Sequence, residues 1–404
     1  MRYAGGVRIV FFLVVSGLAH WLAGSWVLST FAKPVSKPRR RLVFGGAAGL
    51  AITLAAMRLL ASVHDTRAMR VALGVVMLEL AVVIIGLVPL GFLTLLLRAV
   101  QRVAVRFTRP APEAIPPPPE PARLVTRRQA IERVAGVTVF GATSVGLGWG
   151  IVRGRHAFAL EEVVVRVKGW PRVLDGYTIA QVSDVHVGTF VGDRELDEGF
   201  ELVAKIRPDL VVATGDLVDF ESHVIGQLAQ RLLRIDARDG ACAILGNHDH
   251  YAGPGEVARI LRASGVRVLS NESVVLRPGD GGGFALLGVD DLQGRVRGVE
   301  GYRGPDLSAA LRGVAPDLPR ILLAHQPKYL EESSGRVALQ LSGHTHGGQI
   351  NPGFRPADLF MKYVAGRYER GETSLYVNRG FGVVGPPARI GAPPEVTRVV
   401  LVSG

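Results

Sequence analysis

The sequence predicts an α/β protein whose sheets are covered by helices, preceded by a membrane-spanning region of four helices. Short apolar runs alternate with helical patterns after residue 160, as expected for strands buried on both faces. Before that point, four apolar stretches each reach the ~20 residues that cross a bilayer as a helix. The 404 residues therefore divide into a transmembrane region, residues 1–155, and a folded domain, residues 160–404.

Charge divides the chain at the same place. Residues 1–160 carry 20 of the 47 Lys and Arg but only 5 of the 35 Asp and Glu, so the net charge of +12 belongs to the N-terminal region. Because these cations lie between apolar stretches, they predict membrane flanks and argue against a nucleic-acid-binding surface. The single cysteine, Cys242, excludes an intrachain disulfide, and its apolar neighbours predict a buried, inert thiol.

The basic residues also predict how the helices are oriented. They are concentrated in the links 33–41 and 98–133, which the positive-inside rule places in the cytoplasm. The charges therefore predict a multi-pass protein of the cell (inner) membrane, whose partner is the lipid bilayer. The domain after the fourth helix is expected outside the cytoplasm. The predicted helices cover residues 7–32, 42–61, 71–97 and 134–152.

Two features mark the link before the fourth helix. A proline-rich segment, residues 109–121, predicts an extended spacer. After it, Thr126-Arg127-Arg128-Gln129 resembles a twin-arginine export signal, although adjacent positive-inside arginines explain it equally well. Both interpretations send the following domain outward.

Strands and helices alternate in the second region. Helices are predicted at residues 193–205, 223–234, 255–263, 306–311 and 327–332. Strands are predicted at residues 163–167, 177–182, 210–213, 241–245, 284–288, 321–323, 338–341, 374–377 and 397–402.

Polar residues gather where five of these strands end, the place at which α/β sheets build their sites. Six of the ten histidines lie in these five loops. Carboxylate, imidazole and amide donors without thiolate suit Mn, Fe or Zn. Seven such donors exceed the needs of one ion, whereas two ions sharing one bridging carboxylate account for all of them. The candidate metal ligands are Asp184, His186, Asp216, Asn247, His325, His344 and His346.

The order of these motifs resembles the calcineurin-like metallophosphoesterase superfamily over residues 160–404. The motifs are Asp-x-His at 184–186, Gly-Asp-x-x-Asp at 215–219, Gly-Asn-His-Asp at 246–249, His325, and Gly-His-x-His at 343–346. The resemblance implies an αββα sandwich of two mixed sheets flanked by helices. The Gly-His-Thr-His-Gly-Gly-Gln form and the tail motifs at 377–382 and 385–387 resemble membrane-associated bacterial phosphodiesterases, some related to UDP-diacylglucosamine pyrophosphatases. The multi-helix anchor resembles animal transmembrane proteins with a metallophosphoesterase domain.

The same resemblance implies a role for each motif residue. Asp184, His186 and His346 would bind the first divalent ion. Asn247, His325 and His344 would bind the second, with Asp216 bridging the two. Hydroxide held between the ions would attack phosphorus, His248 would act as a general acid, and Asp219 would orient it.

Three further features leave alternatives open. His250 could touch substrate or belong to a packed loop. Arg379 could hold a phosphate oxygen or form a structural ion pair. Residues 354–370 mix apolar and basic side chains, which could dock on a membrane or pack on the core.

Together these observations predict a membrane-anchored, metal-dependent phosphohydrolase. Its substrate would be a phosphodiester or pyrophosphate, either a phosphorylated small molecule or an envelope phospholipid or lipid-linked phosphate. One alternative is a cytoplasmic-facing pyrophosphatase of the UDP-diacylglucosamine type. Another is a non-catalytic membrane sensor or scaffold.

Overall fold

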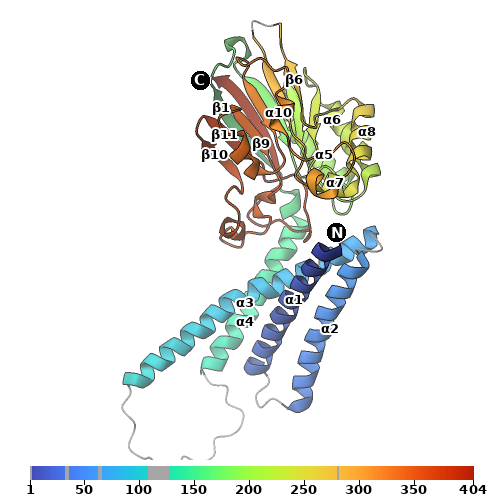
Figure 1. The fold of residues 1–404 in the computed structure, drawn as a ribbon. Helices are drawn as coiled ribbons and strands as arrows, with labels where there is room; N and C mark the ends of the chain where they lie inside the picture. Colours follow the sequence, from blue (N-terminus) through green and yellow to red (C-terminus); the bar gives the residue numbers. More distant parts are fainter. Residues whose placement is uncertain (1, 32–35, 62–65, 108–126, 280–281) are drawn as a thin grey trace, which may run out of the picture. The chain divides into compact units, whose positions relative to one another are not determined.

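The chain forms two compact units in the computed structural model, Met1–Gly148 and Trp149–Gly404 (Figure 1). The structure describes residues 2–31, 36–61, 66–107, 127–279 and 282–404. The division at Trp149 lies a few residues before the boundary expected from the composition. The predicted proline-rich spacer, residues 109–121, lies outside the described residues.

A helix forms at each of the four apolar stretches. Their bounds are α1 (Arg2–Phe31), α2 (Lys37–Ala61), α3 (Arg67–Phe107) and α4 (Arg127–Val152). Among the described residues, Ala68–Leu97 and Gln129–His156 are long and apolar enough to cross a membrane, and Val14–Leu28 is a shorter apolar segment. Two candidate spans are therefore present, and crossing by all four helices stays a prediction. The third helix continues past the predicted residue 97, where arginines with high helix propensity follow.

The described residues of the second unit form two mixed six-stranded sheets, so the predicted α/β class is correct (Figure 1). The first sheet has the order β1-β12-β2-β3-β4-β5 and the second β10-β11-β9-β8-β7-β6. In the first sheet β2, β3, β4 and β5 run parallel, and in the second β7, β8, β9 and β11 run parallel. The strands are β1 (Ala159–Val167), β2 (Tyr177–Val182), β3 (Leu210–Thr214), β4 (Ala241–Ile244), β5 (Arg267–Val268), β6 (Glu272–Leu276), β7 (Phe284–Gly288), β8 (Arg320–Leu323), β9 (Leu339–Ser342), β10 (Gly366–Arg370), β11 (Thr373–Val377) and β12 (Glu395–Ser403).

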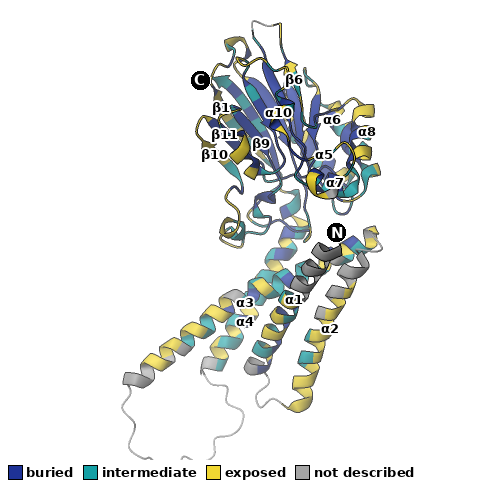
Figure 2. Ribbon diagram, viewed as in Figure 1, coloured by how far each residue is buried: buried dark blue, intermediate teal, exposed yellow. Residues whose placement is uncertain are grey.

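Apolar side chains fill three layers of core, because most strands bury both faces (Figure 2). One cluster lies between the sheets, where Ile179 and Leu210 of the first sheet share a core with Leu323 of the second. Another packs helices against the outer face of the first sheet, and a third covers the second sheet. The helices are α5 (Asp193–Ile206), α6 (Ile225–Arg234), α7 (Asn247–Ala252), α8 (Pro254–Ser264), α9 (Gln293–Arg297), α10 (Leu307–Ala310) and α11 (Leu330–Ser333).

Candidate metal centre

The predicted ligands lie in loops that leave parallel strands at one end of the two sheets. Backbone hydrogen bonds join these loops directly. Asp184 N donates to Gly215 O at 2.9 Å within the first sheet, and Gly343 N donates to His325 O at 3.0 Å within the second. His344 N then donates across the sheets to Asp184 Oδ1 at 2.8 Å. The two sheets therefore contribute ligands to one site.

In the described part of the chain, three groups of three side chains each bring their donor atoms within 4.8 Å of one another. The first is Asp184 with His186 and His346, the second is Asp216 with His325 and His344, and the third, His186 with Asp216 and His248, joins the other two. In the first group, the Nε2 atoms of His186 and His346 lie 3.1 Å apart. In the second, His325 Nε2 lies 3.3 Å from Asp216 Oδ2 and 3.2 Å from His344 Nδ1. His186 Nε2 reaches to within 3.7 Å of Asp216 Oδ2, which links the groups.

Backbone contacts fix the direction of these side chains. The backbone O of Thr214 accepts a hydrogen bond from His325 Nδ1 at 2.8 Å. This bond engages the proton on Nδ1, so Nε2 is the nitrogen that faces the site. His248 N donates to Asp216 Oδ1 at 2.7 Å and leaves Oδ2 for the cluster. The loops thus orient the donors toward the cluster.

The donor set fits divalent metal ions. Asp184, Asp216 and His325 are buried, and isolated buried charges are costly unless they are paired or coordinate a metal. Burial, together with the neighbouring His186 and Arg389, holds the pKa of His346 well below its usual value, so its imidazole is neutral as a ligand must be. The buried Oδ1 of Asn247 makes no hydrogen bond with the described residues. A bound ion would satisfy that oxygen.

His248 lies beside the cluster with its Nδ1 held by Asp219. Its Nδ1 is 3.0 Å from the backbone O of Asp219 and 3.4 Å from Oδ1. The rings of Phe220 and Tyr251 flank the imidazole, each with its centroid at 5.2 Å. Burial disfavours the charged imidazole, but the carboxylates of Asp216 and Asp219 outweigh it and raise the pKa of His248 to about 9. The residue therefore carries a proton at neutral pH in the protein chain alone.

Both predicted substrate contacts pair with acidic residues of the second unit, and Arg379 also lines a cavity beside the metal loop at Gly347. His250 is completely buried, with Nε2 2.8 Å from Asp290 Oδ1, so it belongs to the packed loop and does not face a substrate. Arg379 pairs with Glu161 and with the buried Glu395, whose Oε2 lies 2.6 Å from Arg379 Nε. The structural ion pair is therefore the arrangement adopted by Arg379.

Two buried residues support the site, and the sequence argument missed one of them, Arg389. The buried guanidinium of Arg389 donates to the carbonyls of Arg379, Gly380, Gly382 and Ala392 and lies 3.2 Å from His346 Nδ1. Asp249 accepts from the backbone N–H groups of Leu217, Val218 and Gly246. The only signal for Arg389 was its place just after the Gly385-Pro386-Pro387 motif, with Glu395 six residues further on as the nearest acidic residue in the sequence.

Comparison with known proteins identifies the family of the chain. The family described as calcineurin-like phosphoesterase matches residues 177–348, the stretch that contains all seven candidate ligands. An uncharacterized metallophosphoesterase, YkuE of Bacillus subtilis (strain 168), is 33% identical over 292 residues, which cover 69% of this chain and 98% of that protein. The chain belongs to the calcineurin-like metallophosphoesterase family.

Animal relatives match over a similar length. A bovine (Bos taurus) "transmembrane protein with metallophosphoesterase domain" is 34% identical over 286 residues, 68% of this chain and 64% of that protein. A zebrafish (Danio rerio) protein with the same description is 32% identical over 293 residues, 69% of this chain and 67% of that protein. The match therefore spans about two thirds of these animal proteins, and the resemblance to this group predicted from the sequence is confirmed.

Proposed function

We propose that this chain is a membrane-anchored phosphohydrolase that uses two divalent metal ions to cleave a phosphodiester or pyrophosphate bond. The observation that carries the proposal is the pair of three-residue donor groups, linked through Asp216, with His248 beside them and its Nδ1 held by Asp219. A module that only binds a ligand has no need of a proton donor at this place. Family membership supports the reaction class.

The two ions would be held as the residues are grouped. Asp184, His186 and His346 would bind one ion, and Asn247, His325 and His344 the other, with Asp216 between them. Bound ions of this kind stabilise negative charge on a phosphoryl group and lower the pKa of a coordinated water. The donor types suit Mn, Fe or Zn.

His248 would deliver the proton to the leaving oxygen. Its Nδ1–H is engaged with Asp219, so the second proton of the imidazolium, on Nε2, is the one available to a substrate. Thr189 Oγ1 donates to the Asp219 carboxylate and thereby fixes the residue that orients the histidine. The rings of Phe220 and Tyr251 lie beside the imidazole.

We further propose that the substrate is linked to a lipid and is cleaved outside the cytoplasm. Helix α4 carries a candidate membrane span directly into the second unit, and the animal relatives are described as transmembrane proteins. A cavity of about 640 Å³ adjoins the metal loop at Gly347 and is lined in part by Phe354, Arg355 and Tyr376. It offers room for a substituent larger than a phosphate group.

The test uses the full chain purified in detergent with added Mn²⁺. Hydrolysis of bis-p-nitrophenyl phosphate and of p-nitrophenyl phosphate is compared among the wild type, Asp216→Asn and His248→Ala. We expect each substitution to lower kcat by roughly 10²-fold or more. Mn²⁺ should raise the Tm of the wild type and of His248→Ala but not that of Asp216→Asn.

The outcomes separate the candidate functions. Turnover lost in both variants supports the hydrolase, and the faster substrate distinguishes diesterase from monoesterase. Turnover that persists in Asp216→Asn would refute the proposed centre. A Tm that rises with Mn²⁺ without turnover of either compound, or of lipid extracts, would favour the sensor or scaffold.

A further inference from the structure

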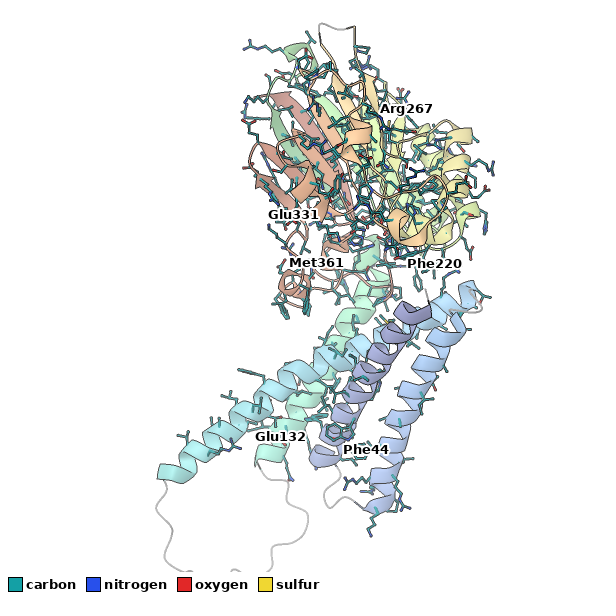
Figure 3. All side chains as sticks on the ribbon, viewed as in Figure 1. Phe44, Glu132, Phe220, Arg267, Glu331 and Met361 are labelled. Atoms are coloured by element: carbon teal, nitrogen blue, oxygen red, sulfur yellow. The ribbon has the colours of Figure 1, made fainter. Side chains whose placement is uncertain are left out.

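Four large apolar side chains are exposed together on one short segment of the second unit. Within the segment 354–361, which we call the apolar loop, the exposed fractions are 60% for Phe354, 73% for Leu359, 87% for Phe360 and 42% for Met361. Figure 3 shows Met361 at the end of this unit where Phe220, the neighbour of His248, also lies. Scattered apolar residues are ordinary on a surface, but four within one loop form a patch.

The loop is an ordered turn whose base belongs to the core. Phe360 N and Met361 N both donate to Ala357 O, at 3.0 and 2.9 Å. Tyr363 and Val364, which follow the loop, are buried. The sequence left open whether residues 354–370 face a membrane or pack on the core, and the structure divides them into this exposed turn, a buried base and strand β10. The apolar side chains are therefore held outward by their own backbone.

Most of the charge beside the loop is offset, although Lys362 shares the carboxylate of Glu331 with Arg370. Arg355 Nε lies 2.8 Å from Asp358 Oδ1, and Lys362 Nζ lies 3.8 Å from Glu331 Oε1. A surface for nucleic acid or an acidic protein would present unmatched cations. An apolar tip with largely neutralised flanks instead suits the boundary between the headgroups and acyl chains of a bilayer.

The base of the loop is tied to the end of helix α4. Arg389 N donates to Gly150 O at 3.2 Å, and the next residue, Ile390, exchanges hydrogen bonds with Gln349 O at 2.9 Å and Asn351 N at 2.8 Å. Phe354 follows three residues after Asn351. Near the end of the candidate span, Trp149 is 52% exposed, and tryptophan is enriched where helices leave a bilayer. The loop thus starts close to the point where the chain would emerge from lipid.

We propose that the apolar loop inserts into the surface of the bilayer that holds α4. The inference rests on the membrane anchor of the proposed function and does not depend on which substrate is cleaved. Because the loop follows His344, His346 and Gly347 along the chain, insertion would fix the metal centre at the level of the lipid headgroups. Four side chains alone would bind lipid weakly, but the covalent anchor makes the docking intramolecular.

The experiment uses the full chain in nanodiscs of phosphatidylcholine and phosphatidylglycerol. An environment-sensitive NBD fluorophore is attached at Phe360→Cys, and quenching by lipids spin-labelled near the headgroup is measured. The matched control is Val173→Cys, because Val173 is 66% exposed and lies in η2 (Arg172–Leu174), before β2 and therefore away from the strand ends that form the site. The native Cys242 is buried.

We expect blue-shifted, strongly quenched fluorescence at position 360 and neither effect at position 173. High salt should change the result little, because most of the flanking charge is offset. Equal quenching at the two positions would overturn the proposal. The measurement is repeated in amphipol, which holds the protein without a bilayer. An equal blue shift there would also overturn the proposal, because the loop would then contact a second copy or another part of the chain.

A second variant separates docking from catalysis. With the fluorophore at Met361→Cys, the double substitution Leu359→Ser and Phe360→Ser should remove the quenching while hydrolysis of bis-p-nitrophenyl phosphate is unchanged. Quenching that persists in this variant would contradict insertion of the loop. A chain that fails to enter nanodiscs would refute the anchor and the docking together, and a chain that enters but is not quenched would refute the docking alone.

Discussion

Backbone strain is concentrated at the residues that form the candidate metal centre. Asp184, His186, Asp216 and His346 have φ near +52°, and His344 has φ of +72°. Left-handed backbone costs a non-glycine residue roughly 1–3 kcal/mol and persists where the surroundings enforce it. Here the hydrogen bonds between loops enforce it. The strain turns each side chain toward the cluster, which regular strand geometry would not do.

Substitution of Gly246 tests how closely these loops must approach one another. A Cβ at Gly246 would lie 2.3 Å from Asp216 Oδ1 and 2.4 Å from Asp216 N. Gly246→Ala should therefore displace the carboxylate between the two donor groups. We expect hydrolysis to fall by roughly 10²-fold or more, with the circular dichroism spectrum retained.

The control for this prediction is the same substitution in helix α6. A Cβ at Gly226 would meet nothing within 4 Å, and alanine favours a helix over glycine by roughly 0.5–1 kcal/mol. Gly226→Ala should leave activity unchanged and the Tm equal or higher. Full activity in Gly246→Ala would mean that the loop tolerates more movement than the contacts imply.

Alkylation of the lone cysteine, Cys242, tests the prediction that its thiol is buried and inert. Burial raises the pKa of Cys242 to about 11. At pH 8 only about one thiol in a thousand is then ionised. Iodoacetamide should modify the native protein far more slowly than the urea-unfolded protein, measured by mass spectrometry. Because the folded state holds the pKa of the thiol high, the alkylation rate of the native protein should still rise above pH 9. Rapid native alkylation at pH 8 would contradict this burial.

At the scale of elements, Arg389 holds together several loops that the sequence leaves unconnected. Its buried guanidinium donates to four carbonyl groups of residues 379–392 and touches His346. Gln349 fixes the same region from the metal loop, with its Nε2 2.7 Å from Pro386 O and its Oε1 accepting from Val384 N at 3.0 Å. These contacts explain why the Gly-Gly-Gln and Gly-Pro-Pro motifs occur together in this chain.

Arg389→Leu should be strongly destabilising. It would leave several buried carbonyls without donors, and we expect a loss of about 3 kcal/mol or more in the free energy of unfolding. Mn²⁺ affinity should also fall, by roughly tenfold or more, because His346 loses its support. Urea denaturation and metal titration measure the two effects.

The matched control is Arg194→Leu. Arg194 is an exposed helix residue whose partner is Glu198, at 2.9 Å and four residues away. Loss of such a surface pair should change stability by less than about 0.5 kcal/mol. If both substitutions had the same small effect, the hydrogen bonds of Arg389 would be redundant.

The sequence predicted elements well where one physical pattern dominated. The strand 177–182 and the buried strand 284–288 have the predicted bounds, because continuous apolar runs between turns are unambiguous. The short β5, the partly exposed β6 and the edge strand β10 were missed, since their residues alternate weakly and carry many charges. The burial of His250 was also unpredictable, because its partner Asp290 lies forty residues away and meets it only through the fold.

At the scale of the whole molecule, the candidate centre was predictable because its donors follow separate strands of parallel sheets. Parallel order brings those strand ends together whatever the lengths of the intervening helices. The packing of one sheet on the other came only from the family resemblance, since no residue pattern within a strand names its partner across a core. Two features could be seen only in the structure. They are the hydrogen bonds by which Arg389 supports the loops of the site, and the division of residues 354–370 into an exposed turn, a buried base and a strand.

Orientation in the membrane is the remaining prediction at this scale. The basic link after Leu97 predicts that Arg102 faces the cytoplasm and that the second unit lies outside. Single cysteines at Arg102 and Val173, both exposed, are treated with a membrane-impermeant maleimide on spheroplasts. Position 173 should react at once and position 102 only after permeabilisation. Because Cys242 is buried, it contributes little background. The reverse pattern would place the metal centre in the cytoplasm and favour the cytoplasmic-facing pyrophosphatase, whose substrate would then be a nucleotide-linked lipid.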